Sequence, residues 1–202
     1  MKTQLSKFTL TATFGLALAL AFSCSLQDDD NKGNNIANYR TVRIGNQTWM
    51  AENLNYKVNG SVCYDKDPVN CNKYGRLYDW KTAKTVCPAG WHLPSNADWN
   101  KLVSYVESNN GCNSCAGRYL KATSGWSNGG NGQDAYGFSA LPGGFGSSDS
   151  SFSTVGYYGY WWSSSELSGD YAYSRRMGFS FDGVNNDNDS KSSLQSVLCV
   201  RD

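Results

Sequence analysis

The clearest pattern of apolar and polar positions along the chain predicts one amphipathic helix. Four apolar residues recur at the i, i+3, i+4, i+7 spacing of a single buried helical face: Trp99, Leu102, Val103 and Val106. Ser95 is a favourable N-cap residue, and Asp98 three positions later can complete a capping box. We therefore expect a helix over residues 96–108, which "NNG" at 109–111 ends.

Alternating apolar and polar positions elsewhere predict short β-strands. In "YRTVRIGNQTWMAENLNY" (39–56), Val42 and Ile44 alternate with polar neighbours, and Gly45-Asn46 then predicts a hairpin turn. The stretch 76–87 allows a short helix or turn. From Gly117 onward, short β-prone pieces separated by glycines are typical of antiparallel sheets with long excursions. The expected fold class is α+β, loop-rich, with one or two short helices.

The first 23 residues have the pattern of a secretory signal peptide. Lys2 and Lys7 precede an uncharged apolar run over 8–22, which is short for a membrane span and is followed by Ser23-Cys24. "LAFSC" resembles a lipobox, which implies that Cys24 is diacylated and anchors the protein in a membrane. The alternative is cleavage without lipidation, which would leave a secreted protein with Cys24 as a thiol.

Residues 24–38 are polar and acidic, so we expect a flexible tether there, followed by one domain over 39–202. The run 28–30, three aspartates, resembles the acidic signal that directs some lipoproteins to the outer face of the cell. Removal of residues 1–23 leaves 16 basic and 17 acidic residues, so the chain has no excess of positive charge with which to bind nucleic acid. The chain has 21 Gly, 7 Trp and 13 Tyr, a composition that favours a loop-rich domain with rigid aromatic anchors.

Six cysteines lie in the expected domain, and an even number in an exported protein predicts disulfides. Spacing favours the pairs Cys63–Cys71 and Cys112–Cys115, which leaves Cys87 to pair with Cys199. Redox and zinc interpretations compete with this scheme. However, the Cys-x-x-Cys lacks the flanking strand and helix of a thioredoxin motif, and the first pair is too widely spaced for zinc.

The sequence contains few residues that could carry out catalysis or bind a metal ion. His92 is the only histidine, and a histidine base needs a nucleophile or further metal ligands; we expect it to form hydrogen bonds within the corner "CPAGWHLPSNADW". "NNDNDSKSSLQS" from Asn185 resembles an EF-hand loop but has Ser190 at the sixth and Ser196 at the twelfth position, so a hairpin tip is expected. We expect no enzymatic activity and no cofactor, although a weak calcium site at "DKDPVN" (65–70) stays open.

The aromatic run "GYYGYWW" supplies the candidate ligand contacts, since exposed rings can stack on sugars or anchor protein contacts. The candidates are Tyr157, Tyr158, Tyr160, Trp162 and Glu166. Strand alternation predicts that about half of the rings are buried. One of Trp161 and Trp162 is then expected to point inward, and the sequence leaves open which.

An ordered set of motifs resembles the Fibrobacter succinogenes major paralogous domain over nearly all of residues 40–202. The motifs include "QTWMAENLNY" (47–56), "CYDKDPVNCNKYGRLYDW" (63–80), "CPAGWHLPSNADW" (87–99), "GYWWSSSE" (159–166) and "SVLCVRD" (196–202). The resemblance implies a fold similar to C-type lectins and the formylglycine-generating group. In that fold a cysteine near the first helix bridges to the last strand, which favours Cys87–Cys199.

Departures from these families bear on function. The lectin sugar triplets Glu-Pro-Asn and Gln-Pro-Asp are absent, as are the paired copper-binding cysteines of the formylglycine-generating group, and Leu198 replaces a common Arg. We therefore expect a non-catalytic lipoprotein of the outer membrane or cell surface, acting in adhesion through a polysaccharide or a surface protein. The alternatives are a structural envelope component without a small ligand, and an enzyme related to the formylglycine-generating group.

Overall fold

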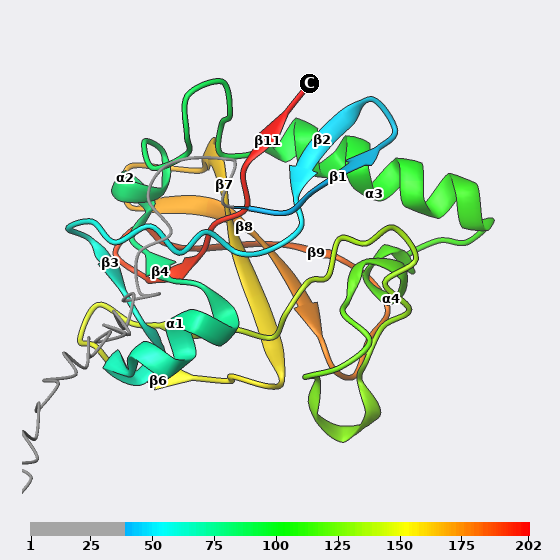
Figure 1. The fold of residues 1–202 in the computed structure, drawn as a ribbon. Helices are drawn as coiled ribbons and strands as arrows, with labels where there is room; N and C mark the ends of the chain where they lie inside the picture. The colour runs from blue at the N-terminus through cyan, green and yellow to red at the C-terminus, as the bar shows by residue number, and fades with distance from the viewer. Residues whose placement is uncertain (1–38) are drawn as a thin grey trace, which may run out of the picture.

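The computed structural model describes residues 39–202 of the chain. The predicted signal peptide, the lipidation of Cys24 and the acidic tether all fall outside the described residues. Within them the fold is α+β, with several antiparallel sheets and few helices (Figure 1). This confirms the predicted class at that level.

A small three-stranded sheet brings the two ends of the domain together. Strands β1 (Thr41–Ile44) and β2 (Gln47–Met50) form the predicted hairpin, and β2 also pairs with β11 (Val200–Arg201) near the C-terminus (Figure 1). The hairpin turns at Gly45, whose φ of 62° lies in the left-handed region that glycine adopts without steric cost. The Gly-Asn signal therefore placed this turn correctly.

The main sheet has six strands in the order β3-β4-β10-β7-β8-β9. Its members are β3 (Ser61–Val62), β4 (Leu77–Tyr78), β7 (Tyr158–Glu166), β8 (Tyr171–Gly178), β9 (Asn185–Ser190) and β10 (Gln195–Ser196). All neighbours pair antiparallel except β10 and β7, which are parallel. A separate two-stranded ladder joins β5 (Phe145–Gly146) to β6 (Phe152–Ser153).

The long helix begins where the sequence predicts. Helix α3 (Asn96–Asn110) carries the expected capping box between Ser95 and Asp98, and Gly111 ends it in a left-handed conformation with φ 61°. The helix ends at Asn110, two residues later than expected, because the left-handed Gly111 is the residue that terminates it. Both end signals were therefore read correctly to within two residues.

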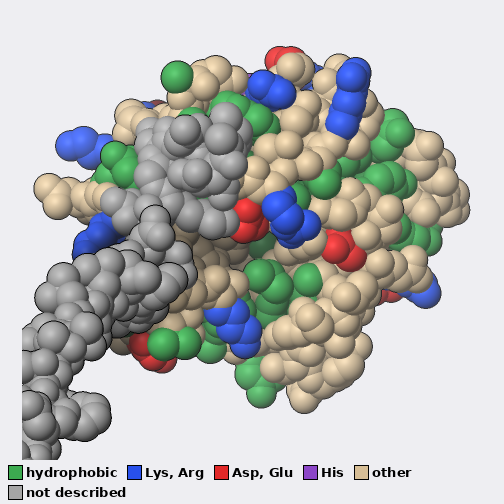
Figure 2. Space-filling view, in the orientation of Figure 1, with side chains coloured by type: hydrophobic (Ala, Val, Ile, Leu, Met, Phe, Trp, Pro, Cys, Tyr) green, Lys and Arg blue, Asp and Glu red, His purple; other side chains and the backbone are tan. Residues whose placement is uncertain are grey.

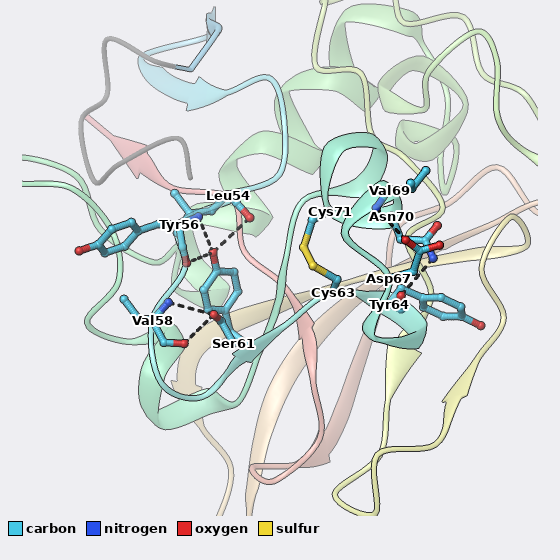
Figure 3. The surroundings of a disulfide bond; sticks show 11 residues. Leu54, Tyr56, Val58, Ser61, Cys63, Tyr64, Asp67, Val69, Asn70 and Cys71 are labelled. Carbon is cyan, nitrogen blue, oxygen red and sulfur yellow. Dashed lines mark hydrogen bonds between the residues drawn. A yellow bond between two sulfur atoms is a disulfide. The ribbon is translucent and has the colours of Figure 1, made fainter. Parts of the chain in front are cut away.

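The expectation of one or two short helices was too low, because three further α-helices form. They are α1 (Pro68–Tyr74), α2 (Trp80–Ala83) and α4 (Ala116–Leu120), with 3-10 turns at Tyr64–Lys66 and Ser127–Gly129. The first turn of helix α1 lies inside the segment that Cys63 and Cys71 close, and Cys71 is itself a residue of the helix (Figure 3). Asp67 caps it by accepting a 2.9 Å hydrogen bond from the Val69 N–H, and Pro68 occupies the first helical position, where no hydrogen bond is lost.

The cysteines of the domain pair as Cys63–Cys71, Cys87–Cys199 and Cys112–Cys115. The second pair spans 112 residues and ties the segment before α3 to the chain just before β11. The third joins the end of α3 to the start of α4. Each disulfide thus fixes a junction between elements.

Trp161 and Trp162 are both buried, which corrects the expectation that only one points inward. Neighbours on a strand face opposite sides, so both faces of β7 must be covered at this point. The Trp161 Nε1–H donates to Asn53 Oδ1 at 2.7 Å, and the Trp162 Nε1–H donates to the Tyr78 carbonyl at 2.7 Å. Strand β7 lies inside the sheet and is packed on both sides, so strand alternation does not sort its rings into inside and outside.

Candidate functional site

A hollow of about 430 Å³ opens on one face of the main sheet, and we call it the β9 hollow. Strands β5, β7, β8 and β9 each contribute to its wall. The lining residues are Phe145, Tyr160, Arg176, Asn186, Asp187, Asn188 and Asp189. Two aromatic residues and five polar or charged residues therefore line one surface depression.

Strand register explains why side chains from distant parts of the chain meet here. Tyr160 is paired with Arg176, and Arg176 with Asn185. Paired residues of antiparallel strands project to the same face, and so do positions i and i+2 of one strand. Tyr160, Arg176, Asp187 and Asp189 consequently share one face of the sheet.

The expected hairpin tip at 185–196 is wrong for its first half. Residues Asn185–Ser190 form β9, the edge strand, through six paired positions with β8. Asn and Asp have low strand propensity, but here the side chains find specific partners across the sheet. Tertiary pairing outweighs local preference in this segment.

Arg176 is held in place by a carboxylate and by aromatic rings. Its Nε lies 2.7 Å from Asp187 Oδ2, and its guanidinium lies 5.6 Å from the Tyr158 ring centroid and 5.7 Å from that of Phe181. Partly buried cation–π contacts of this kind add to the ion pair. The guanidinium therefore presents a rigid planar donor group to the hollow.

The carboxylate of Asp189 is held in place by two hydrogen bonds. Its Oδ2 accepts hydrogen bonds from Ser174 Oγ at 2.8 Å and from Gln195 Nε2 at 2.7 Å. Gln195 lies on β10 and is almost fully buried. The core of the sheet thus orients one of the carboxylates that line the β9 hollow.

Tyr160 supplies the main aromatic surface of the β9 hollow. Its ring packs edge-on against Phe145, with centroids 5.2 Å apart and an interplanar angle of 63°. Burial raises the pKa of Tyr160 above its ordinary value, so the hydroxyl stays protonated at neutral pH. The residue offers both a ring face and a neutral hydroxyl group.

The predicted ligand contacts do not all lie together. Tyr158 lies beside Tyr160, with ring centroids 6.1 Å apart, and Tyr157 is exposed and packs on Phe179. Trp162 is fully buried, so its prediction as a ligand contact is wrong: its indole N–H is used inside the core. Glu166 lies at the opposite end of β7, where Lys191 binds it.

Sequence reasoning missed Phe145, Arg176 and the polar residues of β9. No local sequence pattern marks these residues. Each joins the site only because its strand pairs with a strand that is distant in sequence. The segment "NNDNDS" contains no apolar residue, so it has no alternation of apolar and polar positions that could indicate a strand. Only its pairing with β8, which no local pattern predicts, places Asp187 and Asp189 on one face.

A larger hollow of about 540 Å³, the Tyr56 hollow, lies between the loop 56–60 and α2. Its polar groups hold this junction together: Asp79 Oδ1 accepts from the Thr82 N–H at 2.8 Å, and Thr82 Oγ1 donates to the Asn59 carbonyl at 3.3 Å. Tyr56 is the one aromatic residue in its lining. The β9 hollow is smaller, yet it combines more rings with more polar groups suited to a ligand.

His92 lies in a structural corner. Its Nε2 is 3.4 Å from Asp98 Oδ2, and 48% of its side chain is exposed. Asp98 is the better connected residue, because Ser95 donates to its Oδ2 from both N–H, at 2.9 Å, and Oγ–H, at 2.7 Å, while Gln47 Nε2 lies 3.3 Å from Oδ1. The serine bonds to the aspartate and not to the histidine, so this is a helix start without the arrangement of a catalytic triad.

Asp98→Asn is expected to lower the free energy of unfolding by about 1–2 kcal/mol at pH 7, because the capping box loses its charged acceptor. Burial alone would raise the pKa of Asp98, but the hydrogen bonds from Ser95 and the nearby His92 outweigh it and lower the pKa. The stabilisation is then complete above the unfolded-state pKa of about 3.9 and is lost as pH falls through the lower folded-state pKa. Urea denaturation at pH 7 and pH 3 measures the change.

The difference between wild type and Asp98→Asn should narrow at pH 3. His92→Gln is the control, since it removes the partly exposed partner but keeps the capping box, and it should cost about 0.5 kcal/mol. A difference between wild type and Asp98→Asn that is the same at both pH values would contradict the assigned role of the carboxylate.

Residues 39–202 contain no cluster of three or more His, Cys, Asp or Glu side chains arranged to hold a metal ion. Within the same residues, no helix has the length and apolar character needed to cross a membrane.

Comparison with known proteins identifies a family. The model of the Fibrobacter succinogenes major domain matches residues 42–201, which include every strand and helix of the domain except the first residue of β1. Neither the curated proteins nor the solved structures contain a significant match. The chain belongs to the Fibrobacter succinogenes major domain family.

Proposed function

We propose that this protein is a non-catalytic recognition module that binds neutral glycan chains in the β9 hollow. The observation that carries the proposal is the meeting of Tyr160 and Phe145 with the fixed guanidinium of Arg176 and the carboxylates of β9 in a single depression of about 430 Å³. Ligand sites typically combine an apolar surface with a few well-placed polar groups. A sugar ring offers the matching surfaces, an apolar C–H face and a rim of hydroxyl groups.

The charges in the hollow favour a neutral glycan over an acidic one. Arg176 is already paired with Asp187, and Asp189 adds a second carboxylate. A uronate or sulfate group would meet this excess of negative charge and would have to compete for an occupied guanidinium. Hydroxyl groups, in contrast, can donate to the carboxylates and accept from the remaining N–H groups of Arg176.

A C-type lectin-like fold is the finer assignment that we propose for the domain. The Cys87–Cys199 disulfide supports it, since it joins the segment before the long helix to the chain just before the last strand. The lectin triplets that bind sugar through calcium are missing from the sequence. The proposed binding therefore relies on rings, a guanidinium and carboxylates, without a cofactor.

Lipidation of Cys24 would hold this domain at the outer membrane or cell surface, where extracellular polysaccharides are accessible. The N-terminal sequence pattern supports this placement. The near balance of 16 basic and 17 acidic residues after removal of residues 1–23 gives nucleic acid no electrostatic footprint. Together, these features support an adhesive role in which the protein binds a neutral polysaccharide.

Tyr160→Ala is expected to weaken binding to neutral polysaccharides at least tenfold, because the central ring of the hollow is lost. The experiment is a screen of the full chain on an array of neutral and acidic polysaccharides, followed by titration with the best neutral ligand. Thermal unfolding of the variant checks that the domain remains folded.

Tyr171→Ala is the matched control, because Tyr171 is an exposed tyrosine at the first residue of β8 and does not line the hollow. It should leave binding unchanged. Equal weakening by both variants, preference for acidic polysaccharides, or the lack of any polysaccharide ligand would overturn the proposal. In the last case the structural envelope role becomes the better explanation.

A further inference from the structure

A row of aromatic side chains leads out of the β9 hollow, and we call it the aromatic run. Its members, in order of contact, are Phe145, Tyr160, Tyr158, Phe179 and Tyr157. The ring centroids of successive members lie 5.2, 6.1, 5.9 and 5.4 Å apart. The first two members line the hollow, so the run is continuous with it.

The residues of the aromatic run reach the surface. Tyr157 is 42% exposed, and the other four members are each partly exposed. Trp161 and Trp162, which follow Tyr160 on β7, are in contrast fully buried. Adjoining apolar rings at the surface of a folded domain are typical of a recognition site.

Strand geometry gives the rings of the run their place on the sheet. Tyr158 and Tyr160 are two positions apart on β7, so they project to the same face. Gly178 is the β8 partner of Tyr158. A Cβ atom at Gly178 would lie 2.8 Å from Tyr158 Cε1 and 2.3 Å from a ring atom of Phe181. The absence of a side chain at Gly178 therefore gives these two rings the space to lie over β8.

The chain that carries Phe179 is held at several points. The Phe179 N–H donates to the Tyr157 carbonyl at 2.9 Å, which joins the last two members of the run. Lys121 is only 2% exposed, and its Nζ donates to the carbonyls of Gly178 at 2.9 Å and Phe181 at 3.2 Å. The rings are thus held in place before a ligand arrives, which reduces the entropy lost on binding.

The aromatic run carries little charge. Among the described residues, Arg176 is the one cation that lies over a ring of the run, 5.6 Å from the Tyr158 centroid, and it is already paired with Asp187. The face of the molecule shown in Figure 2 likewise has charged side chains of both signs scattered among hydrophobic and uncharged ones. A neutral partner with apolar surfaces suits such a run better than a highly charged one.

We infer that the aromatic run extends the glycan site, so that the protein binds a neutral chain over several successive sugar residues. This inference rests on the proposed function: the β9 hollow holds one part of the chain, and the rings from Tyr158 to Tyr157 stack on the sugar residues that follow. The spacing of the rings is comparable to the length of a sugar residue. Because the loss of translational and rotational freedom is incurred once, each further residue that stacks on a ring adds affinity.

The test measures how affinity depends on chain length. Calorimetric titration of the full chain uses disaccharides and hexasaccharides derived from cellulose, mannan, xylan, laminarin and amylose. The best hexasaccharide should bind about tenfold more tightly than the disaccharide of the same glycan. Equal affinity for the two lengths would overturn the inference and leave the proposed function standing, whereas no binding of any compound would overturn both.

Variants at the far end of the run locate the added contacts. Tyr157→Ala and Phe179→Ala should each weaken hexasaccharide binding about fivefold and leave disaccharide binding unchanged, because neither residue lines the hollow. Tyr160→Ala should weaken the binding of both lengths. Tyr171→Ala, at the other end of β8, is the matched control and should change neither.

Thermal unfolding checks that each variant is folded. Tyr157 is the most exposed member of the run, so Tyr157→Ala keeps the test valid if Phe179→Ala fails to fold. Unchanged hexasaccharide binding in Tyr157→Ala, or an equal loss of affinity at both lengths, would sink the inference.

Discussion

Replacing both Cys87 and Cys199 with serine is expected to lower the free energy of unfolding by about 4–5 kcal/mol. The disulfide closes a segment of 112 residues, so its loss releases a large conformational entropy in the unfolded chain. The bond also secures a bridge in which His92 and Val200 exchange two backbone hydrogen bonds of 2.9 Å. Urea denaturation of the oxidised proteins measures the difference.

The double replacement of Cys112 and Cys115 is the natural control. These residues are only three positions apart, and the same entropy relation gives a loss of ~2 kcal/mol for so short a loop. The long-range disulfide should therefore matter at least twice as much. Equal losses in the two variants would show that loop closure is not the source of the stabilisation.

Asn53→Ala is expected to cost about 3 kcal/mol, because Asn53 joins three parts of the fold through one buried amide. Its Nδ2 donates to the Tyr74 carbonyl at the end of α1 and lies 3.3 Å from Ser196 Oγ on β10, while its Oδ1 accepts from Trp161 on β7. Removal of the amide leaves buried partners unsatisfied. Chemical denaturation gives the value.

A double-mutant cycle with Trp161→Phe isolates the bond between Asn53 and the indole. Phenylalanine keeps most of the buried ring but has no N–H to donate. The combined variant should lose about 1 kcal/mol less than the two single losses together, because the shared hydrogen bond can be broken only once. Strictly additive losses would show that packing, and not this bond, determines the importance of Trp161.

The buried tryptophans also position the proposed glycan site. Trp161 and Trp162 fix β7 from both of its faces, and Tyr160 is the residue immediately before them. A ring that binds a ligand with little loss of entropy must be held in place before the ligand arrives. Core packing of β7 is thus the physical link between the stability of this domain and its proposed recognition of glycans.

Local signals in the sequence determined the elements whose causes are local. The capping residues Ser95 and Asp98 and the apolar stripe around Trp99 set the start and the buried face of α3, and Gly45-Asn46 set the first hairpin. The set of sequence motifs identified the family over nearly all of the domain, residues 42–201. Helix α1 has a local signal of its own in Asp67-Pro68, an N-cap residue followed by a proline at the first helical position.

The tertiary structure alone decided which side chains meet. Trp162 is an aromatic residue of the kind that often contacts ligands, but it is buried because both faces of β7 are covered. The segment from Asn185 has the composition of a turn, but pairing with β8 made it a strand and brought Asp187 to Arg176. Such outcomes depend on strands that are distant in sequence, and the free energy of their pairing is not encoded in any single stretch of the chain.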